Sequence, residues 1–513
     1  ALASFLLGLP VVRQRQAGVP AMDLRGWFAD AFAQDEWRVS ANTTINYGVR
    51  YEYASPLWDA HFTNSNLDLS SGTPVAFIGG QEKYPNGLMY ANHLDFAPRV
   101  GVAHNIPSLG LIVRGAYGIF YTPVDYNSWC NQRHNVPYVF PETDQGDNYT
   151  PSPAIAGFNF APAVLGKTVV SFASFSLHPS PQYIQQWNAT IEKSLGAATT
   201  VEIGYLGARG FHLQRAHLIN NALPGPGAIE PRRRFQHISF AQGTVIPPVI
   251  EGNPVDVASL TFPVSAINLL ETTAQSWYDA GYINLRRRYS HGFSILANYT
   301  FSKNLSNAPD FRSPMYESTI PQNNNDLAAE KGPACDIPQR FVVSAVYAGP
   351  AYMRSKWTRI ATENWMFSMI YQAESGYPFT VSVFGDTANA GTILGENPIR
   401  ANVTGKPIFG PGTRNSAHWI NPAAFAAPAP YTFGNAGRNS VYGPGMQTMD
   451  LSAQRTMPLH KQMAFLVRGD FFNAFNHTNL GSPNRFVNTP QFGSITTAMT
   501  PGREIQLSAR FQF

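Results

Sequence analysis

Hydrophobic and polar side chains alternate with a period of two residues along much of this chain. Residues 44–53 read TINYGVRYEY, 293–302 read FSILANYTFS and 503–513 read REIQLSARFQF. Successive side chains of a β-strand point to opposite faces of its sheet. Each of these segments is therefore predicted to be a strand with one apolar and one polar face.

Segments of this kind recur about thirteen times. Most span 9–14 residues, whereas strands of globular proteins have about 5–6 and a tilted strand that crosses a bilayer needs about 9–11. The predicted strands lie near residues 25–38, 43–53, 96–105, 111–121, 183–194, 199–207, 276–289, 293–303, 339–348, 363–375, 446–457, 462–475 and 503–513.

The connections between these segments alternate between short and long. The short ones have three or four residues, except for a longer link near 349–362. Tight periplasmic turns and long extracellular loops are typical of outer-membrane barrels. The long connections cover about 54–95, 122–182, 208–275, 304–338, 376–445 and 476–502. The predicted fold is all-β: a partial transmembrane antiparallel up-and-down β-barrel with short periplasmic turns and long extracellular loops.

Two other fold classes fit the sequence less well. Charge-free stretches occur at 168–191 and 417–437, but prolines and polar residues interrupt both, so neither is a membrane-spanning helix. A soluble propeller or sandwich would also show alternation, but its strands would be shorter and its loops more even. Charged residues make up 13% of the chain and aromatic residues another 13%. This balance favours a β-protein that contacts an apolar solvent, and a net charge of +4 argues against a nucleic-acid partner.

Short motifs distributed over the whole chain resemble one family. In order they are ASFLLGLP at 3–10, QDEWRV at 34–39, NYGVRYE at 46–52, APRVG at 97–101, RGAYGIFY at 114–121, QQWN at 185–188, GYLG at 204–207, YTFSK at 299–303, QRFV at 339–342, SGYPF at 375–379 and DFFNAFNH at 470–477. Their order and spacing resemble the C-terminal barrel of TonB-dependent outer-membrane receptors, in particular the Oar-like group. The resemblance implies a location in the bacterial outer membrane.

Barrels of that family have 22 strands around an N-terminal plug domain. The resemblance implies that about thirteen strands of an expected 22 are present here. Residues 1–22 would be an extracellular loop remnant and residues 23–513 the C-terminal part of the transmembrane barrel. The plug, its TonB-coupling box and the earlier strands would be missing, so we expect the chain to begin within a longer protein. The segment near residue 25 would then be an unpaired edge strand, which is prone to aggregation.

No catalytic motif is apparent in the sequence. Nucleophile-elbow, phosphate-loop and zinc-protease patterns are missing, and Asp35 and Glu36 would point to opposite faces of one strand. His212 and His217 stand five residues apart beside a long loop, where solvation is favoured over metal ligation. We therefore expect no enzyme activity, no cofactor and no metal.

The charged residues on the polar faces of the strands are the candidate functional residues. A lipid-facing Arg or Lys costs about 2–4 kcal/mol at the bilayer midplane, so these charges should face the lumen. They would either guide substrate and contact the plug or form ion pairs that fill space, and both interpretations stay open. The residues are Arg50, Glu52, Arg99, Arg114, Arg468, Asp470, Glu504 and Arg510.

The chain contains two runs of three arginines. Arg232 to Arg234 lie in a long loop, where a solvated charge run is favoured over contact with lipopolysaccharide or another anionic ligand. Arg286 and Arg288 near a short turn should face the lumen, with Arg287 extending to the membrane interface.

Three further residues have specific expectations. Cys130 and Cys335 fall in long outer loops, where a disulfide is possible but two unpaired thiols are favoured. Phe513 ends the chain on the apolar face of an alternating strand. This terminal Phe resembles the signal through which the barrel-assembly machinery recognises outer-membrane proteins.

Two functions remain open at this level. The first is a TonB-dependent receptor barrel that imports a bulky substrate such as a nutrient, a glycan, a peptide or a metal chelate. The second is a non-transport adhesin or secretion-linked surface scaffold built on the same barrel. Expected partners are outer-membrane lipid and lipopolysaccharide, the barrel-assembly machinery through the C-terminal strand, the TonB complex only through the missing plug, and an unidentified substrate.

Overall fold

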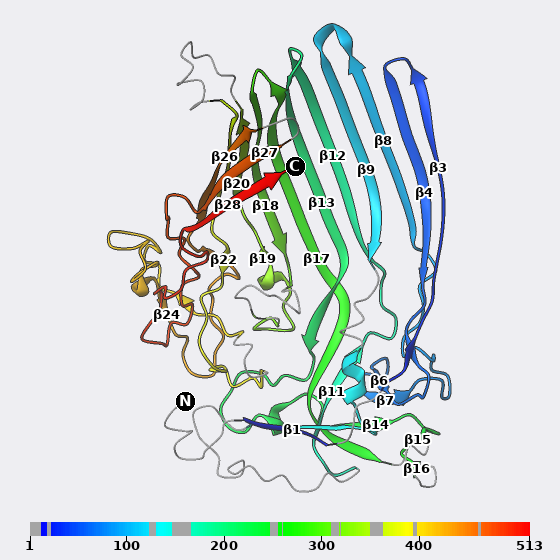
Figure 1. Cartoon of the computed structure of the whole chain (residues 1–513). Coiled ribbons are helices and arrows are strands. Elements are labelled where there is room, and N and C mark those ends of the chain that lie inside the picture. Colours follow the sequence, from blue (N-terminus) through cyan, green and yellow to red (C-terminus); the bar gives the residue numbers. More distant parts are fainter. Residues whose placement is uncertain are drawn as a thin grey trace.

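The computed structural model describes residues 12–17, 22–122, 130–145, 166–246, 255–258, 260–308, 318, 320–348, 363–392, 398–459 and 463–513. A tall curved sheet and a layer of folded loops at one of its ends make up the described chain (Figure 1). In the described residues, no helix has the length and hydropathy of a membrane span.

Thirteen strands form one antiparallel meander in which each strand pairs with the next along the chain. All thirteen correspond to predicted segments, so the predicted all-β fold is confirmed. The strands are β3 (Phe28–Ser40), β4 (Thr43–Ala54), β8 (Phe96–Ile106), β9 (Leu111–Thr122), β12 (Gln182–Leu195), β13 (Thr199–Leu218), β17 (Thr261–Ser290), β18 (Phe293–Ser306), β20 (Gln339–Tyr347), β21 (Trp365–Glu374), β26 (Met446–Pro458), β27 (Ala464–Phe472) and β28 (Glu504–Gln512).

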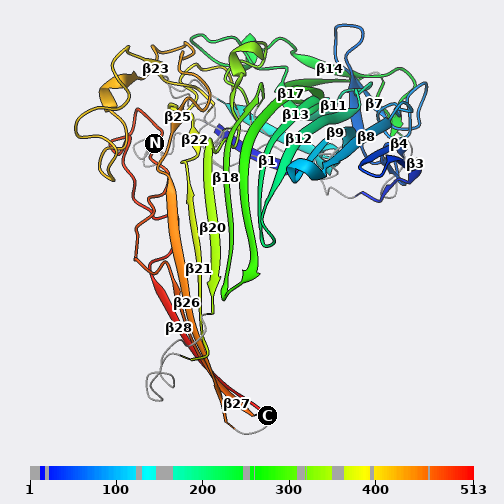
Figure 2. The same cartoon turned by 90° about the horizontal axis from the view of Figure 1, so that it is seen from above.

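The sheet has two edges, β3 and β28, which lie apart in both views (Figures 1 and 2). Every residue of both edge strands is exposed. In the described chain, β3 pairs in register with β4, and β28 pairs with β27. The prediction of an edge strand near the start of the chain is therefore confirmed, although that strand begins at Phe28 and not at Arg25.

Short turns join the strands at the end of the sheet that we call the turn end. Gly196 (φ +77°) and Gly292 (φ +79°) occupy left-handed positions in two of these turns. Glycine adopts this conformation without the strain that a Cβ atom causes. The link near 349–362, the exception to the predicted rhythm, lies outside the described residues.

At the opposite end, which we call the loop end, the structure departs from the prediction. β13 runs on to Leu218, and β17 begins at Thr261, within a segment predicted to be loop. Their extensions continue to pair, from Leu213 with Ala274 to Leu218 with Asn268. The prediction of a continuous loop over 208–275 was therefore wrong at both ends. The alternation breaks down there, because the polar Gln214 and Arg215 are adjacent, as are the apolar Leu269 and Leu270, and the pairing register shifts at Leu213.

The long connections and the segment before β3 contain further short elements. The strands are β1 (Val12–Ala17), β2 (Leu24–Arg25), β5 (Trp58–Asp59), β6 (Ser65–Asp68), β7 (Val75–Ile78), β10 (Phe140–Gln145), β11 (Val170–Phe175), β14 (His237–Phe240), β15 (Val245–Ile246), β16 (Val255–Asp256), β19 (Gly332–Pro333), β22 (Pro378–Phe379), β23 (Asn402–Val403), β24 (Phe425–Ala426) and β25 (Val441–Tyr442). The short 3₁₀ helices of the long connections are Cys130–His134, Glu230–Arg232, Ala328–Glu330 and Pro422–Ala424, and one more, Pro107–Leu109, lies in the short turn between β8 and β9.

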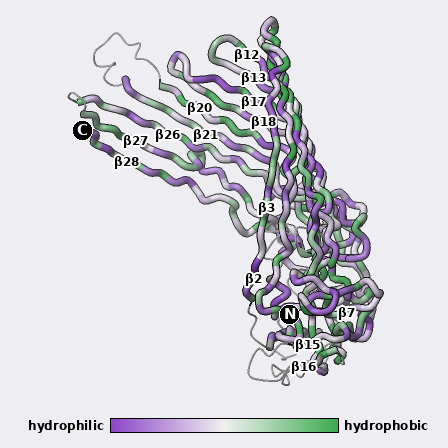
Figure 3. Tube along the Cα trace, turned by 90° about the vertical axis from the view of Figure 1, so that its right-hand side faces the viewer, coloured by the Kyte–Doolittle hydropathy of each residue, from purple (hydrophilic) through white to green (hydrophobic). Residues whose placement is uncertain are grey.

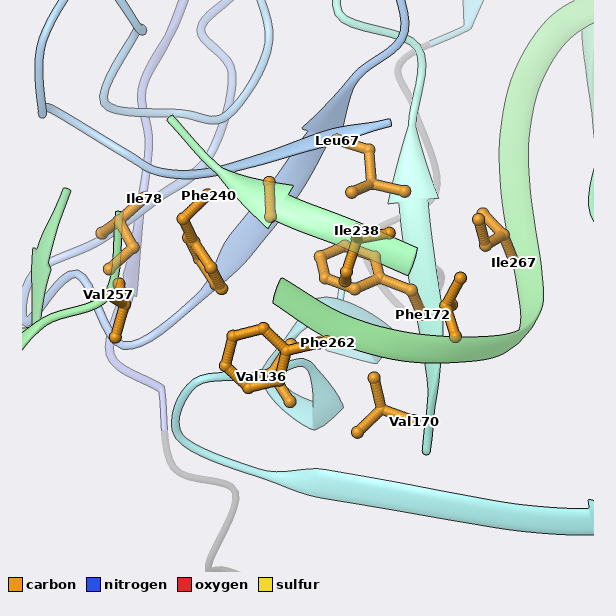
Figure 4. Packing of buried hydrophobic residues seen from close by; sticks show 12 residues of the cluster. Leu67, Ile78, Val136, Val170, Phe172, Ile238, Phe240, Val257, Phe262 and Ile267 are labelled. Carbon is orange, nitrogen blue, oxygen red and sulfur yellow. The ribbon is translucent and has the colours of Figure 1, made fainter. Parts of the chain in front are cut away.

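Hydrophobic burial concentrates in this loop layer and not between the membrane-length strands. One core joins Leu67, Phe172, Ile238, Phe262 and their neighbours from β6, β11, β14 and the extension of β17 (Figure 4). A second core gathers residues of the connections after β21 and β27, including Phe379, Ile420 and Phe492. These cores make the loop layer a folded unit, because buried apolar area is the main source of stability.

Candidate functional site: the polar face of the sheet

Residues that pair directly across an antiparallel ladder share one face of the sheet. The registers link the eight predicted lumen residues to one another from β4 to β28: Arg50, Glu52, Arg99, Arg114, Arg468, Asp470, Glu504 and Arg510. We call this side the polar face and the opposite side the apolar face. Asp35 and Glu36 fall on opposite faces, as the alternation predicts.

Arg50 forms the first group of ion pairs on the polar face. Its Nη2 atom lies 2.7 Å from Asp30 Oδ2 on β3, and its Nε donates to Glu52 Oε1 at 2.6 Å. One guanidinium therefore connects two carboxylates on neighbouring strands. Sequence reasoning missed Asp30, whose partner becomes apparent only from the register between β3 and β4.

A longer network crosses the middle of the polar face. Arg114 Nη1 lies 2.9 Å from Glu192 Oε2 and 3.9 Å from Glu202 Oε2. Asn284 donates to Glu202 Oε1 at 3.1 Å, and Asn298 in turn donates to Asn284. The network therefore connects β9 with β12, β13, β17 and β18.

The remaining predicted residues divide into two groups. Arg468 contacts Asp470 at 2.8 Å on β27. Among the described residues, Arg99, Glu504 and Arg510 form no ion pair. Five of the eight charges thus belong to ion pairs, so the ion-pair interpretation accounts for most of the set and leaves three charges available for contact with another group.

A cavity of about 150 Å³ lies at the loop end of the sheet, between β3, β4 and β9. Its lining includes Glu52, Tyr53, Asp95 and Tyr121. Burial and the neighbouring charge of Glu52 raise the pKa of Asp95, in the loop directly before β8, to about 6. Sequence reasoning missed Asp95, because the cavity joins separate segments that range from Phe28 to Gln182 in the chain.

The apolar face exposes large hydrophobic side chains that a soluble protein would bury. Examples are Trp37, Ile203, Phe301 and Leu507, whose exposed fractions are 56%, 57%, 58% and 78%. Hydrophobic and hydrophilic stretches alternate along these strands (Figure 3). Exposed hydrophobic side chains that lie on the same face of strands from β3 to β28 are typical of contact with lipid. Phe513, at 91% exposure, follows the strand that continues this face.

Aromatic side chains gather towards the loop end of the apolar face. Tyr183 lies between Tyr121 and Phe211, with ring centroids 5.7 and 5.2 Å away. Nearby on the same face, the charged residues Asp279 and Arg209 form an ion pair at 2.9 Å. Aromatic belts at the membrane–water interfaces are typical of outer-membrane barrels.

The run of arginines at 232–234 is not a solvated charge run, and the favoured prediction was wrong. Arg233 is buried, forms an ion pair with Glu230 at 2.7 Å and donates to the carbonyl oxygen of Asn220 at 2.9 Å. Arg232 donates to backbone carbonyls of the same layer. Only Arg234 of the three is exposed. Their backbone acceptors lie in the folded loop layer, which no period in the sequence indicates.

The second arginine run, residues 286–288, agrees with the prediction as far as the pairing between β17 and β18 assigns its residues to faces. Arg286 pairs with Leu296 on the polar face, and Arg287 lies on the apolar face with its guanidinium 6.0 Å from the Phe293 ring. The register shifts after Arg287, so it does not assign Arg288 to a face.

The histidine pair does not converge on a shared ligand position. His212 contacts the carbonyl oxygen of Pro181, whereas His217 contacts Glu271 at 3.2 Å. Among the described residues, no three His, Cys, Asp or Glu side chains form a group that could hold a metal ion. Cys335 is exposed, but the side chain of Cys130 lies outside the described residues, and so does the predicted choice between a disulfide and two thiols.

A large antiparallel meander with one charged face and one exposed aromatic face defines an outer-membrane β-barrel protein. The chain belongs to the outer membrane beta barrel domain family, whose sequence profile matches residues 1–506. Its location is the bacterial outer membrane.

Several solved structures are similar to this chain at low identity. They include the siderophore receptor PirA from Acinetobacter baumannii (9% identity, TM-score 0.41, 95% of this chain and 45% of that chain). The copper transporter OprC (9%, 0.43, 95% and 49%) and the outer membrane transporter YddB from Escherichia coli (10%, 0.41, 98% and 52%) are two others. The chain spans about half the length of these structures. No curated protein sequence matches it.

Proposed function

We propose that the protein is the barrel of a TonB-dependent receptor that imports a bulky substrate across the outer membrane. The observation that carries this proposal is the separation of charge: eight predicted charged residues share one face, and exposed hydrophobic side chains cover the other. In a barrel, the polar face lines the lumen, because charges on the lipid side are costly. The family resemblance of the sequence motifs adds support.

In this proposal, the substrate moves along the polar face between the loop end and the turn end. Arg99, Glu504 and Arg510 are the charges that can contact it or a plug domain, since the other five are held in ion pairs. Energy would come from the TonB complex through a plug. Lipopolysaccharide would surround the loop end, and the barrel-assembly machinery would recognise the C-terminal strand.

One observation favours a second candidate function. The loop layer has its own hydrophobic cores, and a folded outer layer is also suited to an adhesin or a secretion-linked scaffold. The two functions differ in whether any substrate crosses the membrane. Uptake therefore distinguishes them.

The experiment measures uptake of labelled ferric chelates, oligosaccharides and peptides by cells with and without the full-length protein, each with and without a protonophore. A receptor predicts uptake of at least one probe class that needs both the protein and the proton gradient. Equal uptake in all cells for every probe class would contradict the proposal and favour the adhesin.

A matched pair of variants on β18 tests whether the substrate moves along the polar face. Asn298 lies on the polar face, and Ala297 is its neighbour on the apolar face. Asn298→Trp should slow uptake because it narrows the path. Ala297→Trp should leave uptake unchanged, because the added ring faces lipid.

A further inference from the structure

Three long connections meet around a small polar cavity within the loop layer. The cavity has a volume of about 20 Å³ and is lined by Thr380, Ser382, Arg400, Arg438 and Arg485, together with Gln322 and Glu330. These residues come from the connections after β18, β21 and β27. The cavity lies apart from the charged residues of the polar face described above.

The lining of this cavity carries three guanidinium groups and one carboxylate. Arg400, Arg438 and Glu330 are each at most 5% exposed. Arg400 Nη2 lies 3.2 Å from Glu330 Oε1. Arg438 Nε donates to the backbone carbonyl oxygen of Glu330 at 2.7 Å. The charge of the lining is therefore positive, in a place where water screens it poorly.

One donor in this cluster has no acceptor in the described chain. Arg400 uses its Nη1 for the carbonyl oxygen of Ala329 and its Nη2 for Glu330, whereas its Nε has no hydrogen-bond partner. A buried donor without a partner costs about 1–3 kcal/mol. Burial lowers the pKa of Arg400. The carboxylate of Glu330 opposes this shift, and the positive charge of Arg438 adds to it. An anion beside Nε would accept the missing hydrogen bond and would also offset the cost of burying the positive charge.

We propose that this cavity binds a small inorganic anion of chloride's size, held by Arg400 Nε with the hydroxyl group of Ser382 beside it. The Ser382 hydroxyl makes only a long hydrogen bond of 3.4 Å, to the carbonyl oxygen of Thr380, whereas the Thr380 hydroxyl already donates to Asn439 Oδ1 at 2.9 Å. The volume decides the class of anion, because about 10–15 Å³ accommodates one water molecule and 20 Å³ leaves no room for sulfate or phosphate. The bound anion ties the three connections together. This role is independent of the cargo of the barrel, so it stands whether or not uptake is found.

Two measurements on the full-length protein in detergent test the site. Crystals soaked in sodium bromide should show an anomalous peak within hydrogen-bonding distance of Arg400 Nε. The midpoint of thermal unfolding should rise with chloride concentration when gluconate replaces chloride at constant ionic strength, because a ligand that binds only the folded state stabilises it.

Substitutions identify the residues responsible. Arg400→Met should abolish the bromide peak and the chloride dependence. Ser382→Ala should weaken the chloride dependence, and it serves as the second test if Arg400→Met fails to fold. Arg414→Met removes an exposed loop arginine and should leave both signals unchanged. A wild-type protein with no anomalous peak in the cavity, or with equal midpoints in chloride and gluconate, would overturn the proposal.

Discussion

Arg114 on β9 and Glu192 on β12 form an ion pair across the polar face, with Nη1 and Oε2 2.9 Å apart. Their strands are neighbours, and Arg114 also reaches Glu202 on β13, so one arginine connects three strands. The side chains are 42% and 24% exposed. Water therefore weakens the attraction, and the pair adds modestly to stability while it fixes the position of both charges.

We expect Arg114→Gln and Glu192→Gln each to lower the free energy of unfolding by less than about 1 kcal/mol, with a coupling energy of about 0.2–1 kcal/mol. Denaturant unfolding of the two single variants and the double variant in detergent measures this coupling. Arg510→Gln is the control, because Arg510 forms no ion pair in the described chain. A coupling energy near zero would show that the contact contributes nothing to stability.

The assignment of faces predicts a large difference between two arginine substitutions. Ile203 lies on the apolar face of β13, and Ser344 lies on the polar face of β20. Ile203→Arg should destabilise the protein in lipid vesicles by about 2–4 kcal/mol, because the charge enters the bilayer. Ser344→Arg should cost less than about 1 kcal/mol, because it faces water. Unfolding titrations in vesicles check both values, and equal losses would contradict the assignment.

The thirteen strands could be predicted because lipid on one side and water on the other impose a period of two on every strand. The same parity placed Arg50 and Arg114 on the polar face. Their partners Asp30 and Glu192 could not be predicted, because the register between strands depends on the three-dimensional pairing. The loop layer could not be predicted for a different reason. Arg233 is buried by segments distant in sequence, and no local pattern indicates that contact.

The cavity at the loop end should make stability depend on pH through Asp95. Burial and Glu52 raise its pKa from 3.8 to about 6, so the folded state holds the proton more tightly than the unfolded chain. The resulting stabilisation is fully present below pH 3.8 and is lost as pH rises through about 6. Asp95→Asn should therefore stabilise the protein above pH 6, by up to about 1 kcal/mol since the side chain is partly solvated.

Unfolding midpoints of the wild type and Asp95→Asn between pH 4 and 8 measure this effect. Glu52→Gln should move the pH dependence of the wild type towards lower pH, because it removes the charge that opposes ionisation of Asp95. A constant difference between the wild type and Asp95→Asn across this range would show that the carboxyl group does not titrate there.

Arg233 and Arg234 provide a matched test of the loop layer. Arg233 is buried with its guanidinium on Glu230 and on the carbonyl oxygen of Asn220, whereas Arg234 is exposed beside the Phe235 ring. Arg233→Ala removes the donor from the buried carbonyl oxygen of Asn220 and from the partly exposed carboxylate of Glu230, and it should destabilise the loop layer by about 1–3 kcal/mol. Arg234→Ala should change it by less than about 0.5 kcal/mol. Hydrogen exchange of residues 219–240 measures both, and equal protection in the two variants would refute the structural role of Arg233.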